Sequence, residues 1–363
     1  MRTLEKLVVR NFKSIREQVL QLGPLNVFIG GNGSGKSNLI EVFRFLREIV
    51  DQNLARYTAK KGGADSLLHF GRKISPSMAI ELEFGEGNKS NGYEVSLAAT
   101  SADELIVSHE LSYYHERDKF KRPYRNPVSS GAKESRLKSD GQLSARQIVS
   151  DLENYRVYHF HDTSESAPMK GMSDVDDNRF LRPQAENLAA FLYWLQQKHP
   201  LHLTNIEDAI RQVAPFFGGF QLTPSKLNSS KIRLEWQETG TDTYFNASAL
   251  SDGTLRFICL ATLLLQPTLP PLLLLDEPEL GLHPAAITLL AALLDSASTR
   301  TQVIIATQSV TLVNQFEPSN VWTVDRENHE SVFRHLSEAQ MTGWLDDYAL
   351  GELWEKNVLG ARP

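Results

Sequence analysis

A run of glycines between an apolar strand and a helix constrains this chain more than any other feature. Residues 30–37 read Gly-Gly-Asn-Gly-Ser-Gly-Lys-Ser. The strand predicted at residues 20–29 ends directly before this run, and apolar residues recur at helical spacing over residues 37–50. The backbone N–H groups of such a loop surround phosphate groups at the start of a helix. The order of strand, loop and helix therefore predicts an α/β fold with a phosphate-binding loop. The alternative is a glycine-rich turn that only caps the helix.

The loop defines the candidate nucleotide site. We expect ATP to be bound by the loop and the first residues of the helix, namely Gly30, Gly31, Asn32, Gly33, Ser34, Gly35, Lys36, Ser37 and Asn38. Lys36 would lie against the β- and γ-phosphates, where it would also serve catalysis because charge stabilisation dominates phosphoryl transfer. The hydroxyl of Ser37 would be a ligand of Mg²⁺.

Two adjacent acids follow a second apolar stretch, at residues 272–275. Carboxylates at the C-terminal end of a central strand face the nucleotide in folds of this kind. We expect Asp276 to hold Mg²⁺ through water and Glu277 to orient or deprotonate the attacking water. The alternative is that both acids only cap the following helix. The loop and the acid pair together predict an ATPase that forms ADP and phosphate, with ATP and Mg²⁺ as cofactors.

The remaining hydrophobic patterns support an α/β core. Short alternating stretches over residues 66–114 predict antiparallel strands. The fully apolar residues 272–275 and 303–306 predict parallel strands that are buried on both faces. We therefore expect a two-lobed core with an antiparallel β subdomain.

The middle of the chain predicts an insertion. Residues 117–150 are rich in Lys, Arg, Ser and Gly, which predicts an exposed hairpin tip or a mobile loop. Helices are predicted at residues 185–197 and 206–216. The expected division is an N-terminal ATP-binding lobe at 1–165, a helical insertion lobe at 166–245 and a C-terminal lobe at 246–363.

Composition excludes some classes of protein. The chain has one cysteine, Cys259, so it forms no internal disulfide and no cysteine-based zinc site by itself. No apolar run is long enough to span a membrane, and the N-terminus has no apolar signal core, so we expect a cytoplasmic protein without membrane contact. A net charge of −6 argues against a basic nucleic-acid-binding surface over the whole chain.

A local basic stretch remains a candidate nucleic-acid contact. It is interleaved with Phe120 and Tyr124, and its basic residues are Arg117, Lys119, Lys121, Arg122, Arg125, Lys133, Arg136 and Lys138. Such residues bind phosphate backbones, and the aromatic rings stack on bases. An ordinary solvated loop explains the same pattern, and the sequence leaves both interpretations open.

A Ser-Asp-Gly turn opens a further apolar helix. Residues 250–254 read Leu-Ser-Asp-Gly-Thr and precede the helix predicted at residues 255–265. Serine and aspartate commonly cap helices, so the turn alone predicts only a helix N-terminus.

In order along the chain, these segments resemble ABC ATPases of the RecF/SMC and OLD-like group. The matching segments are residues 10–14 (RNFKS), 30–38 (GGNGSGKSN), 250–254 (LSDGT), 272–284 (LLLLDEPELGLHP) and 304–309 (IIATQS), and the ending around residues 350–360 resembles stand-alone ATPases of that group. The resemblance implies a P-loop NTPase that forms a homodimer on binding ATP. In such a dimer Ser251 and Gly253 of one copy would meet the γ-phosphate held by the other, and residues 278–284 would reach across the dimer.

Two positions depart from the pattern of the resembled ATPases. Gln308 occupies the place of a switch histidine and is a candidate catalytic residue. Glutamine can hydrogen-bond a γ-phosphate or water but carries no positive charge. The alternative is a polar residue at a strand end that bonds to backbone. His161 and Asp162 stand where a glutamine is expected near Mg²⁺, and they are equally well explained as surface polar residues. His283 is expected at an interface or as a helix cap.

The resemblance implies an ATPase that controls nucleic-acid binding or an effector protein, in DNA maintenance or in defence against phage. The candidate partners are a second copy of the chain, a separate effector or nuclease protein, and DNA or RNA. The alternative is an ATP-dependent scaffold or sensor with slow turnover and no direct nucleic-acid contact. A transporter subunit is disfavoured by Gln308 and by the long insertion before residue 250.

Overall fold

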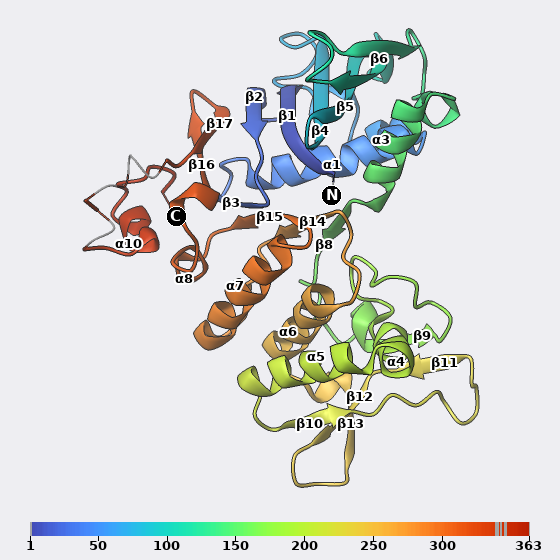
Figure 1. Ribbon diagram of the computed structural model, residues 1–363, viewed down its shortest axis with the longest axis vertical. Coiled ribbons are helices and arrows are strands. Elements are labelled where there is room, and N and C mark those ends of the chain that lie inside the picture. The colour runs from blue at the N-terminus through green and yellow to red at the C-terminus, as the bar shows by residue number, and fades with distance from the viewer. Residues whose placement is uncertain (1, 338–340, 342, 345–346, 363) are drawn as a thin grey trace. The chain divides into compact units, whose positions relative to one another are not determined.

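The computed structural model describes residues 2–337, 341, 343–344 and 347–362. They form two compact units, which are described separately below (Figure 1). The first unit comprises Met1–Tyr155 and Glu317–Pro363, and the second comprises Arg156–Phe316. The division into lobes at 1–165, 166–245 and 246–363 groups residues by motif and stays a prediction.

The first unit contains an antiparallel sheet with the strand order β2-β1-β4-β5-β6-β7. Its strands are β1 (Thr3–Phe12), β2 (Ile15–Gln21), β4 (Ser77–Glu86), β5 (Lys89–Ala99), β6 (Leu105–Glu116) and β7 (Tyr124–Ser129). Residues alternate between a buried and a more exposed face, as in β4, where Met78, Ile80 and Leu82 are buried. The antiparallel strands predicted over residues 66–114 are thus confirmed as β4, β5 and β6.

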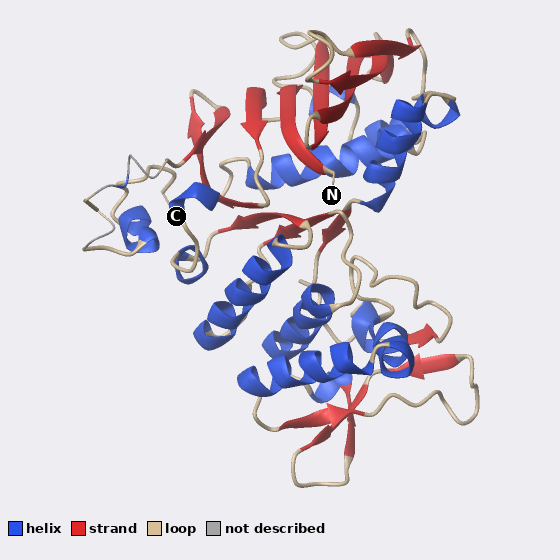
Figure 2. Ribbon diagram, in the orientation of Figure 1, coloured by secondary structure: helices blue, strands red, loops and turns tan. Residues whose placement is uncertain are grey.

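Helices cover one face of this sheet (Figure 2). They are α1 (Lys36–Val50), α2 (Leu54–Lys60) and α3 (Leu143–Asn154), with short 3-10 turns η1 (Ala64–Ser66) and η2 (Leu137–Ser139). The ring of Phe45 in α1 lies 5.5 Å from the ring of Phe12 in β1 and 5.3 Å from that of Tyr57 in α2. Phe12 and Phe45 are fully buried, so each contributes about 1.5–3 kcal/mol to the stability of the unit.

The position of α3 corrects one sequence prediction. Residues 117–150 were expected to form an exposed hairpin tip or a mobile loop. A hairpin tip is present at residues 117–123, which join the antiparallel strands β6 and β7, but the segment also includes β7, η2 and most of α3. Ala145, Ile148 and Leu152 lie on one side of α3 and are buried. Three apolar residues at helical spacing therefore hold this polar segment on the sheet, and the surrounding charged residues hid the pattern.

A second group of strands completes the first unit. Strand β3 (Leu25–Ile29) pairs in parallel with β16 (Val321–Glu327), which pairs antiparallel with β17 (Glu330–His335). The 3-10 turn η5 (Pro318–Asn320) precedes β16, and helix α10 (Leu350–Glu355) follows β17. Trp354 of α10 is fully buried and donates its indole N–H to the carbonyl of Ala361, which anchors the C-terminal segment.

The second unit contains parallel strands covered by helices. Strand β14 (Leu272–Asp276) lies between β8 (Arg156–Tyr158) and β15 (Gln302–Thr307), and all three run in parallel. The parallel strands predicted at residues 272–275 and 303–306 are thus confirmed. Helices α6 (Asp252–Leu265) and α7 (Pro284–Ser298) lie side by side, and the short α8 (Val310–Val313) follows β15 (Figure 1).

The rest of the second unit is the insertion between β8 and α6. Its helices are α4 (Leu188–Lys198) and α5 (Pro200–Val213), with 3-10 turns η3 (Pro168–Lys170) and η4 (Ala247–Ala249). Small strands accompany them: β9 (Met172–Asp174), β10 (Phe217–Phe220), β11 (Lys231–Arg233), β12 (Glu235–Glu238) and β13 (Tyr244–Asn246). The rings of Phe217 and Phe245 lie 6.0 Å and 5.2 Å from the ring of Trp236. The helical insertion was expected from sequence, whereas these strands were not.

No helix in the described part of the chain is both long and apolar enough to cross a membrane.

Candidate functional site

The glycine-rich loop connects β3 to α1 in the first unit. Gly35 is the residue before α1 and has φ 118°, a conformation that side chains with a Cβ rarely adopt. A Cβ at this position would stand 2.0 Å from the hydroxyl oxygen of Ser331 in β17. The Ser331 hydroxyl in turn donates to the carbonyl of Ser34 at 2.5 Å. Backbone conformation and close packing therefore both require glycine at the start of α1.

Lys36 lies folded back over the loop. Its side chain is buried, and its Nζ donates to the carbonyl of Gly30 at 2.5 Å and to that of Gly31 at 3.1 Å. The Ser34 hydroxyl is buried without a hydrogen-bond partner among the described residues, and no atom lies within 4 Å of the place where a Cβ at Gly33 would stand. A loop with a held cation, a free hydroxyl and open space is suited to phosphate groups.

The next two helical residues differ in their contacts. Ser37 is exposed at the second position of α1, whereas the Asn38 side chain donates to the hydroxyl of Ser14 at 2.7 Å. The hydroxyl oxygens of Ser14 and Ser331 are 2.6 Å apart. The start of α1 is thus tied to the loop after β1, the segment that carried the RNFKS match. Asn32 is exposed within the loop.

A cavity of about 790 Å³ adjoins the loop within the first unit. Its lining includes Lys13, Ser14, Asn38, His69, Arg72 and Arg326. Arg326 also donates to the carbonyl of Gly33 at 3.3 Å, which places this cation against the glycine-rich loop. The volume falls in the range of small-molecule and cofactor sites. The lining contains four Lys or Arg side chains and one acid, Asp65, so its balance of charge favours an anionic ligand.

Lys13 is held by a buried acid. Glu41 of α1 accepts hydrogen bonds from the Lys13 and Lys61 ammonium groups and from the Tyr57 hydroxyl, the last at 2.9 Å. Burial alone would raise the pKa of Glu41, but these hydrogen bonds outweigh it and lower the pKa to about 2. The ionised carboxylate therefore fixes Lys13 at the wall of the cavity.

The acid pair lies at the end of β14 in the second unit. Asp276 is the last residue of the strand, and both acids are half-buried. Glu277 has φ 45°, and its N–H donates to the carbonyl of Ala306 in β15 at 2.7 Å. A non-glycine residue in this left-handed region costs about 1–3 kcal/mol and is maintained only by its surroundings. The pairing of β14 with β15 thus directs the Glu277 side chain.

Gln308 contacts the side chain of Glu277. Its amide N–H donates to Glu277 Oε1, so the residue in the switch position is bonded to a carboxylate. The backbone N–H of Gln308 is 3.4 Å from Glu279 Oε1, which also accepts from the Thr307 hydroxyl. Glu279 is buried, its Oε2 has no partner among the described residues, and burial raises its pKa. Glu277, Glu279, Thr307 and Gln308 form one connected group at the ends of β14 and β15.

His161 and Asp162 take different positions after β8. The Nε2–H of His161 donates to the carbonyl of Asp276 at 2.8 Å. Asp162 is exposed, and its carboxylate accepts from the hydroxyl and N–H of Ser164, which lower its pKa. His161 therefore lies at the acid pair, whereas Asp162 caps its own loop.

Ser251 and Gly253 begin helix α6. The Ser251 hydroxyl is exposed and accepts from the N–H of Thr254 at 3.2 Å, so the helix-cap interpretation is confirmed. A Cβ at Gly253 would stand 2.6 Å from the carbonyl oxygen of Gly281. The start of α6 can approach the loop at residues 278–284 only because residue 253 is glycine. His283 accepts from the N–H of Ala285 at 3.3 Å, so its predicted cap role is also confirmed.

Arg256 was missed by the sequence reasoning. Its guanidinium donates to the carbonyls of Phe160, His161 and Leu280, at 3.2, 2.8 and 2.9 Å. It thereby joins the segment after β8 to the loop after the acid pair. A charged residue within the otherwise apolar residues 255–265 was the available signal. Glu279 was also missed, although an acid between Pro278 and Leu280 offered a similar signal.

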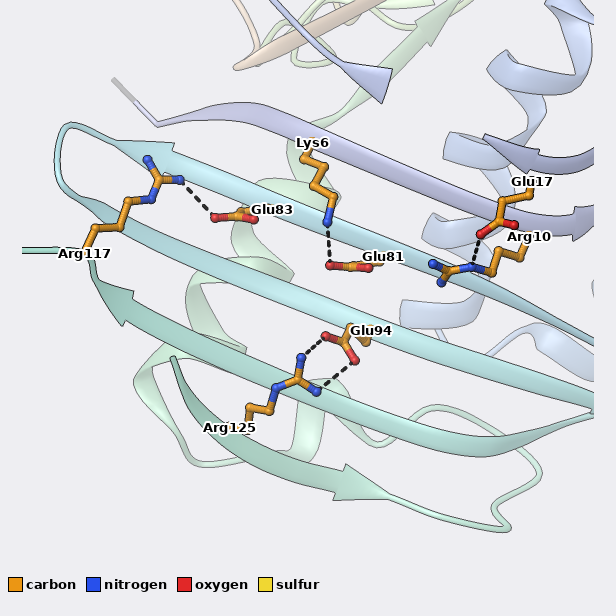
Figure 3. Close-up of polar contacts among 8 residues, drawn as sticks. All are labelled: Lys6, Arg10, Glu17, Glu81, Glu83, Glu94, Arg117 and Arg125. Atoms are coloured by element: carbon orange, nitrogen blue, oxygen red, sulfur yellow. Dashed lines mark hydrogen bonds and ion pairs between the residues drawn. The ribbon is translucent and has the colours of Figure 1, made fainter. Parts of the chain in front are cut away.

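The basic stretch makes ion pairs within the first unit. Figure 3 shows Arg117 beside Glu83 and Arg125 beside Glu94, at 2.9 and 2.8 Å. On the same sheet Lys6 pairs with Glu81 and Arg10 with Glu17 (Figure 3). Lys138 pairs with Asp51 at 2.6 Å and Glu153 at 2.7 Å, and Lys119 with Glu116 at 2.8 Å. These carboxylates neutralise four of the eight basic residues that were candidates for phosphate contact.

No group of three or more His, Cys, Asp or Glu side chains in the described part of the chain is arranged to hold a metal ion. Magnesium commonly takes few protein ligands beside phosphate oxygens and water, so Ser37 and Asp276 remain suitable ligand types.

Comparison with known proteins gives a family match over most of the chain. Residues 25–314 match the sequence profile of the AAA_21 family, described as "AAA domain, putative AbiEii toxin, Type IV TA system".

Curated relatives match over a shorter part. The chain is 32% identical over 116 residues to the "DNA replication and repair protein RecF" of Brucella abortus (strain 2308), which covers 29% of each protein. It is 34% identical over 87 residues to the protein of that name from Acidothermus cellulolyticus, which covers 22% of each. The chain thus matches less than a third of the length of these relatives.

Solved structures of SMC heads have a similar fold. One, an SmcHead bound to the C-winged helix domain of ScpA, has a TM-score of 0.60 and 18% identity, with 93% of this chain and 99% of that chain covered. Another, an Smc head with an extended coiled coil bound to the C-terminal domain of ScpA, derived from Pyrococcus furiosus, has a TM-score of 0.58 and 16% identity, with 96% and 99% covered. These matches confirm the predicted fold class, a P-loop NTPase with an ABC-ATPase-like core, and the resemblance to the RecF/SMC group.

Proposed function

Because this chain belongs to the AAA_21 family, we propose that it binds ATP with Mg²⁺ and hydrolyses ATP to ADP and phosphate. The observation that carries the proposal is the loop between β3 and α1, where Lys36 is buried over the carbonyls of Gly30 and Gly31. A buried lysine at a glycine-rich helix N-terminus is suited to the β- and γ-phosphates. The basic cavity beside the loop offers room for the nucleoside.

The acid pair would supply the hydrolytic step. Ser37 and Asp276 are the proposed Mg²⁺ ligands, and the ion would neutralise charge on the phosphates. Glu277 would orient the attacking water or accept its proton. Gln308 supports this role because its amide holds the Glu277 carboxylate in one orientation. Gln308 carries no charge, so it would act by hydrogen bonding.

A second copy of the chain would complete the site. Ser251 is exposed at the start of α6, where the N-terminal end of the helix dipole favours an anion. Gly253 adds a backbone N–H on the same turn. These features suit the γ-phosphate bound by a partner copy, and ATP would then stabilise the dimer by binding it preferentially.

The biological setting is proposed from the relatives. The matched RecF proteins are named as DNA replication and repair proteins, and the matched SMC head structure is bound to ScpA. We therefore place nucleic-acid binding or an effector protein, including a separate nuclease, under the control of the ATP cycle. DNA maintenance and defence against phage are the two settings in keeping with this control.

ATP turnover tests the proposal. Wild-type protein should release phosphate from ATP in the presence of Mg²⁺, and Lys36→Ala should lose binding and turnover because the fixed cation against the phosphates is gone. Lys226→Ala is the matched control, since Lys226 is an exposed lysine far along the chain in the other unit. Equal ATP affinity and turnover in all three proteins would refute the assignment.

A scaffold or sensor with slow turnover is the second candidate. The observation in its favour is the neutral Gln308 bonded to Glu277, because a group without charge stabilises less of the developing negative charge. Tight ATP binding without measurable phosphate release, with or without DNA or RNA, would favour this candidate.

A further inference from the structure

A cavity of about 430 Å³ lies in the first unit, away from the glycine-rich loop. It is bounded by strands β4 to β7 of the antiparallel sheet and by the first turn of α3. Phe84, Asn91, Tyr114 and Tyr124 line it from four successive strands. None of these residues has a part in the proposed ATP site.

The four residues form one cross-strand row. Strand pairing places Phe84 opposite Asn91, Asn91 opposite Tyr114, and Tyr114 opposite Tyr124. Residues directly opposite one another in a sheet share a face, so the row is continuous. The exposed fraction rises along it, from 1% for Phe84 and 4% for Asn91 to 36% for Tyr114 and 67% for Tyr124. The row thus leads from solvent to a buried amide between aromatic rings.

Asn91 leaves an acceptor without a donor. Its amide nitrogen donates to the Oε1 of Gln147 in α3, whereas its own Oδ1 has no hydrogen-bond partner among the described residues. A buried acceptor without a donor is unfavourable, so a ligand with an N–H donor would gain by pairing with it. Gln147 also lines the cavity, and its amide can supply a donor beside this acceptor.

The first turn of α3 supplies an anion-binding end. Gln142, Leu143 and Ser144 line the cavity. The side chain of Gln142, the residue before the helix, makes no capping bond, and the Asp140 carboxylate accepts from the N–H of Gln142 at 2.7 Å. The first N–H groups of a helix have no partners within the helix, and the dipole favours negative charge there. Leu143 is 70% exposed and covers little of this turn.

The charged side chains of the lining are Arg2, Lys89 and Glu86. Arg2 is paired with Asp151 at 2.8 Å, whereas Lys89 has no ion pair in the described part of the chain. Lys89 is therefore the cation available to an anionic ligand, and Glu86 disfavours a ligand with several negative charges.

We propose that this cavity binds one nucleotide unit, with its base against Tyr114 and Tyr124 and its phosphate at the first turn of α3. A heteroaromatic base has both a face to stack on tyrosine and an edge with N–H and carbonyl groups for Asn91 and Gln147. A single phosphate suits the helix end and Lys89. The unit belongs to a free nucleotide or to a single-stranded nucleic acid, and both present the same chemistry. The proposal goes beyond ATP hydrolysis and does not depend on it.

Two probes separate the sources. AMP, titrated calorimetrically, represents a free nucleotide, and a short fluorescent 5′-phosphorylated oligothymidylate, followed by anisotropy, represents a single strand. Binding of AMP alone supports a free nucleotide, and binding of the oligothymidylate supports a strand. Binding of neither probe overturns the proposal.

Exposed positions allow variants that keep the fold. Tyr124→Ala should weaken binding about tenfold or more, because it removes a stacking ring, while Tyr124→Phe should retain it. Tyr244→Ala is the matched control, since Tyr244 is 62% exposed in the second unit. Leu143→Asp should also weaken binding, because the new carboxylate would repel the phosphate. An acid in the first turn stabilises the helix itself, so the variant should keep its fold. Leu143→Asn, which adds no charge, should leave binding unchanged.

The Lys36→Ala variant tests whether the probes bind at the glycine-rich loop and not in this cavity. Loss of probe binding in Lys36→Ala, with full binding in Tyr124→Ala and Leu143→Asp, would assign the ligand to the glycine-rich loop and overturn the proposal. Full probe binding in Lys36→Ala, with loss of binding in Tyr124→Ala and Leu143→Asp, supports the proposal.

Discussion

Replacing Glu41 by glutamine should destabilise the first unit in a way that depends on pH. The change keeps the size of the side chain but removes the charge that Lys13, Lys61 and Tyr57 share. The pKa of Glu41 is lowered from an ordinary 4.5 to about 2. At 1.36 kcal/mol per unit of pKa, the ionised group contributes up to about 3 kcal/mol at neutral pH.

The sign follows from the direction of the shift. Because the pKa is lower in the folded state, the stabilisation is fully present above about pH 4.5 and is lost as the pH falls through about 2. The difference in unfolding free energy between wild type and Glu41→Gln should therefore be about 3 kcal/mol near pH 7 and about half of that near pH 3.

Urea unfolding at several pH values measures this difference. Glu153→Gln is the control, because Glu153 pairs with Lys138 on the exposed surface and should contribute less than about 1 kcal/mol. A Glu41→Gln difference that is absent near pH 7, or that does not shrink on acidification, would show that the buried carboxylate does not have this role.

Three further changes test local features. Gly35→Ala should lower stability in thermal unfolding and abolish ATP binding in a titration, because its Cβ would lie 2.0 Å from the Ser331 hydroxyl. Gly141→Ala should change neither, because no atom lies within 4 Å of its Cβ position. Gly253→Ala should reduce ATP turnover by displacing the Gly281 carbonyl from the start of α6, and unchanged turnover would show that this close approach is dispensable. Arg125→Glu should lower the unfolding free energy by about 0.5–1 kcal/mol, because the new carboxylate would repel Glu94 on the neighbouring strand. Arg122 has no ion pair in the described part of the chain, so Arg122→Glu should leave the unfolding free energy unchanged.

Sequence patterns predicted the elements whose signal is local. The strands at residues 272–275 and 303–306 are uninterrupted apolar runs, and β14 and β15 lie there. The glycine-rich run, the helix after it and the helix that Ser251 caps were likewise predicted in place. The roles assigned to these residues in ATP binding stay predictions.

Other features depend on contacts between distant residues. Arg256 donates to carbonyls near residue 160 and at Leu280, and nothing in the local pattern of α6 shows that these segments meet there. Gln308 was expected near phosphate or bonded to backbone, and its contact with the Glu277 side chain arises from the parallel pairing of β14 and β15. The phosphate-contact interpretation of Arg117 and Arg125 lost support for the same reason, since the carboxylates that pair with them come from other strands.

Sedimentation of Glu277→Gln with ATP and Mg²⁺ tests the central claim most directly. Glutamine keeps the reach of the side chain but accepts no proton from water, so hydrolysis should fail while the ATP-bound state persists. We predict a dimer that forms only with ATP and is lost when Ser251 is also replaced by a bulky residue, because the larger side chain would block the shared phosphate site. A monomer under all conditions, or a dimer indifferent to both ATP and Ser251, would contradict an ATPase whose site is completed by a second copy.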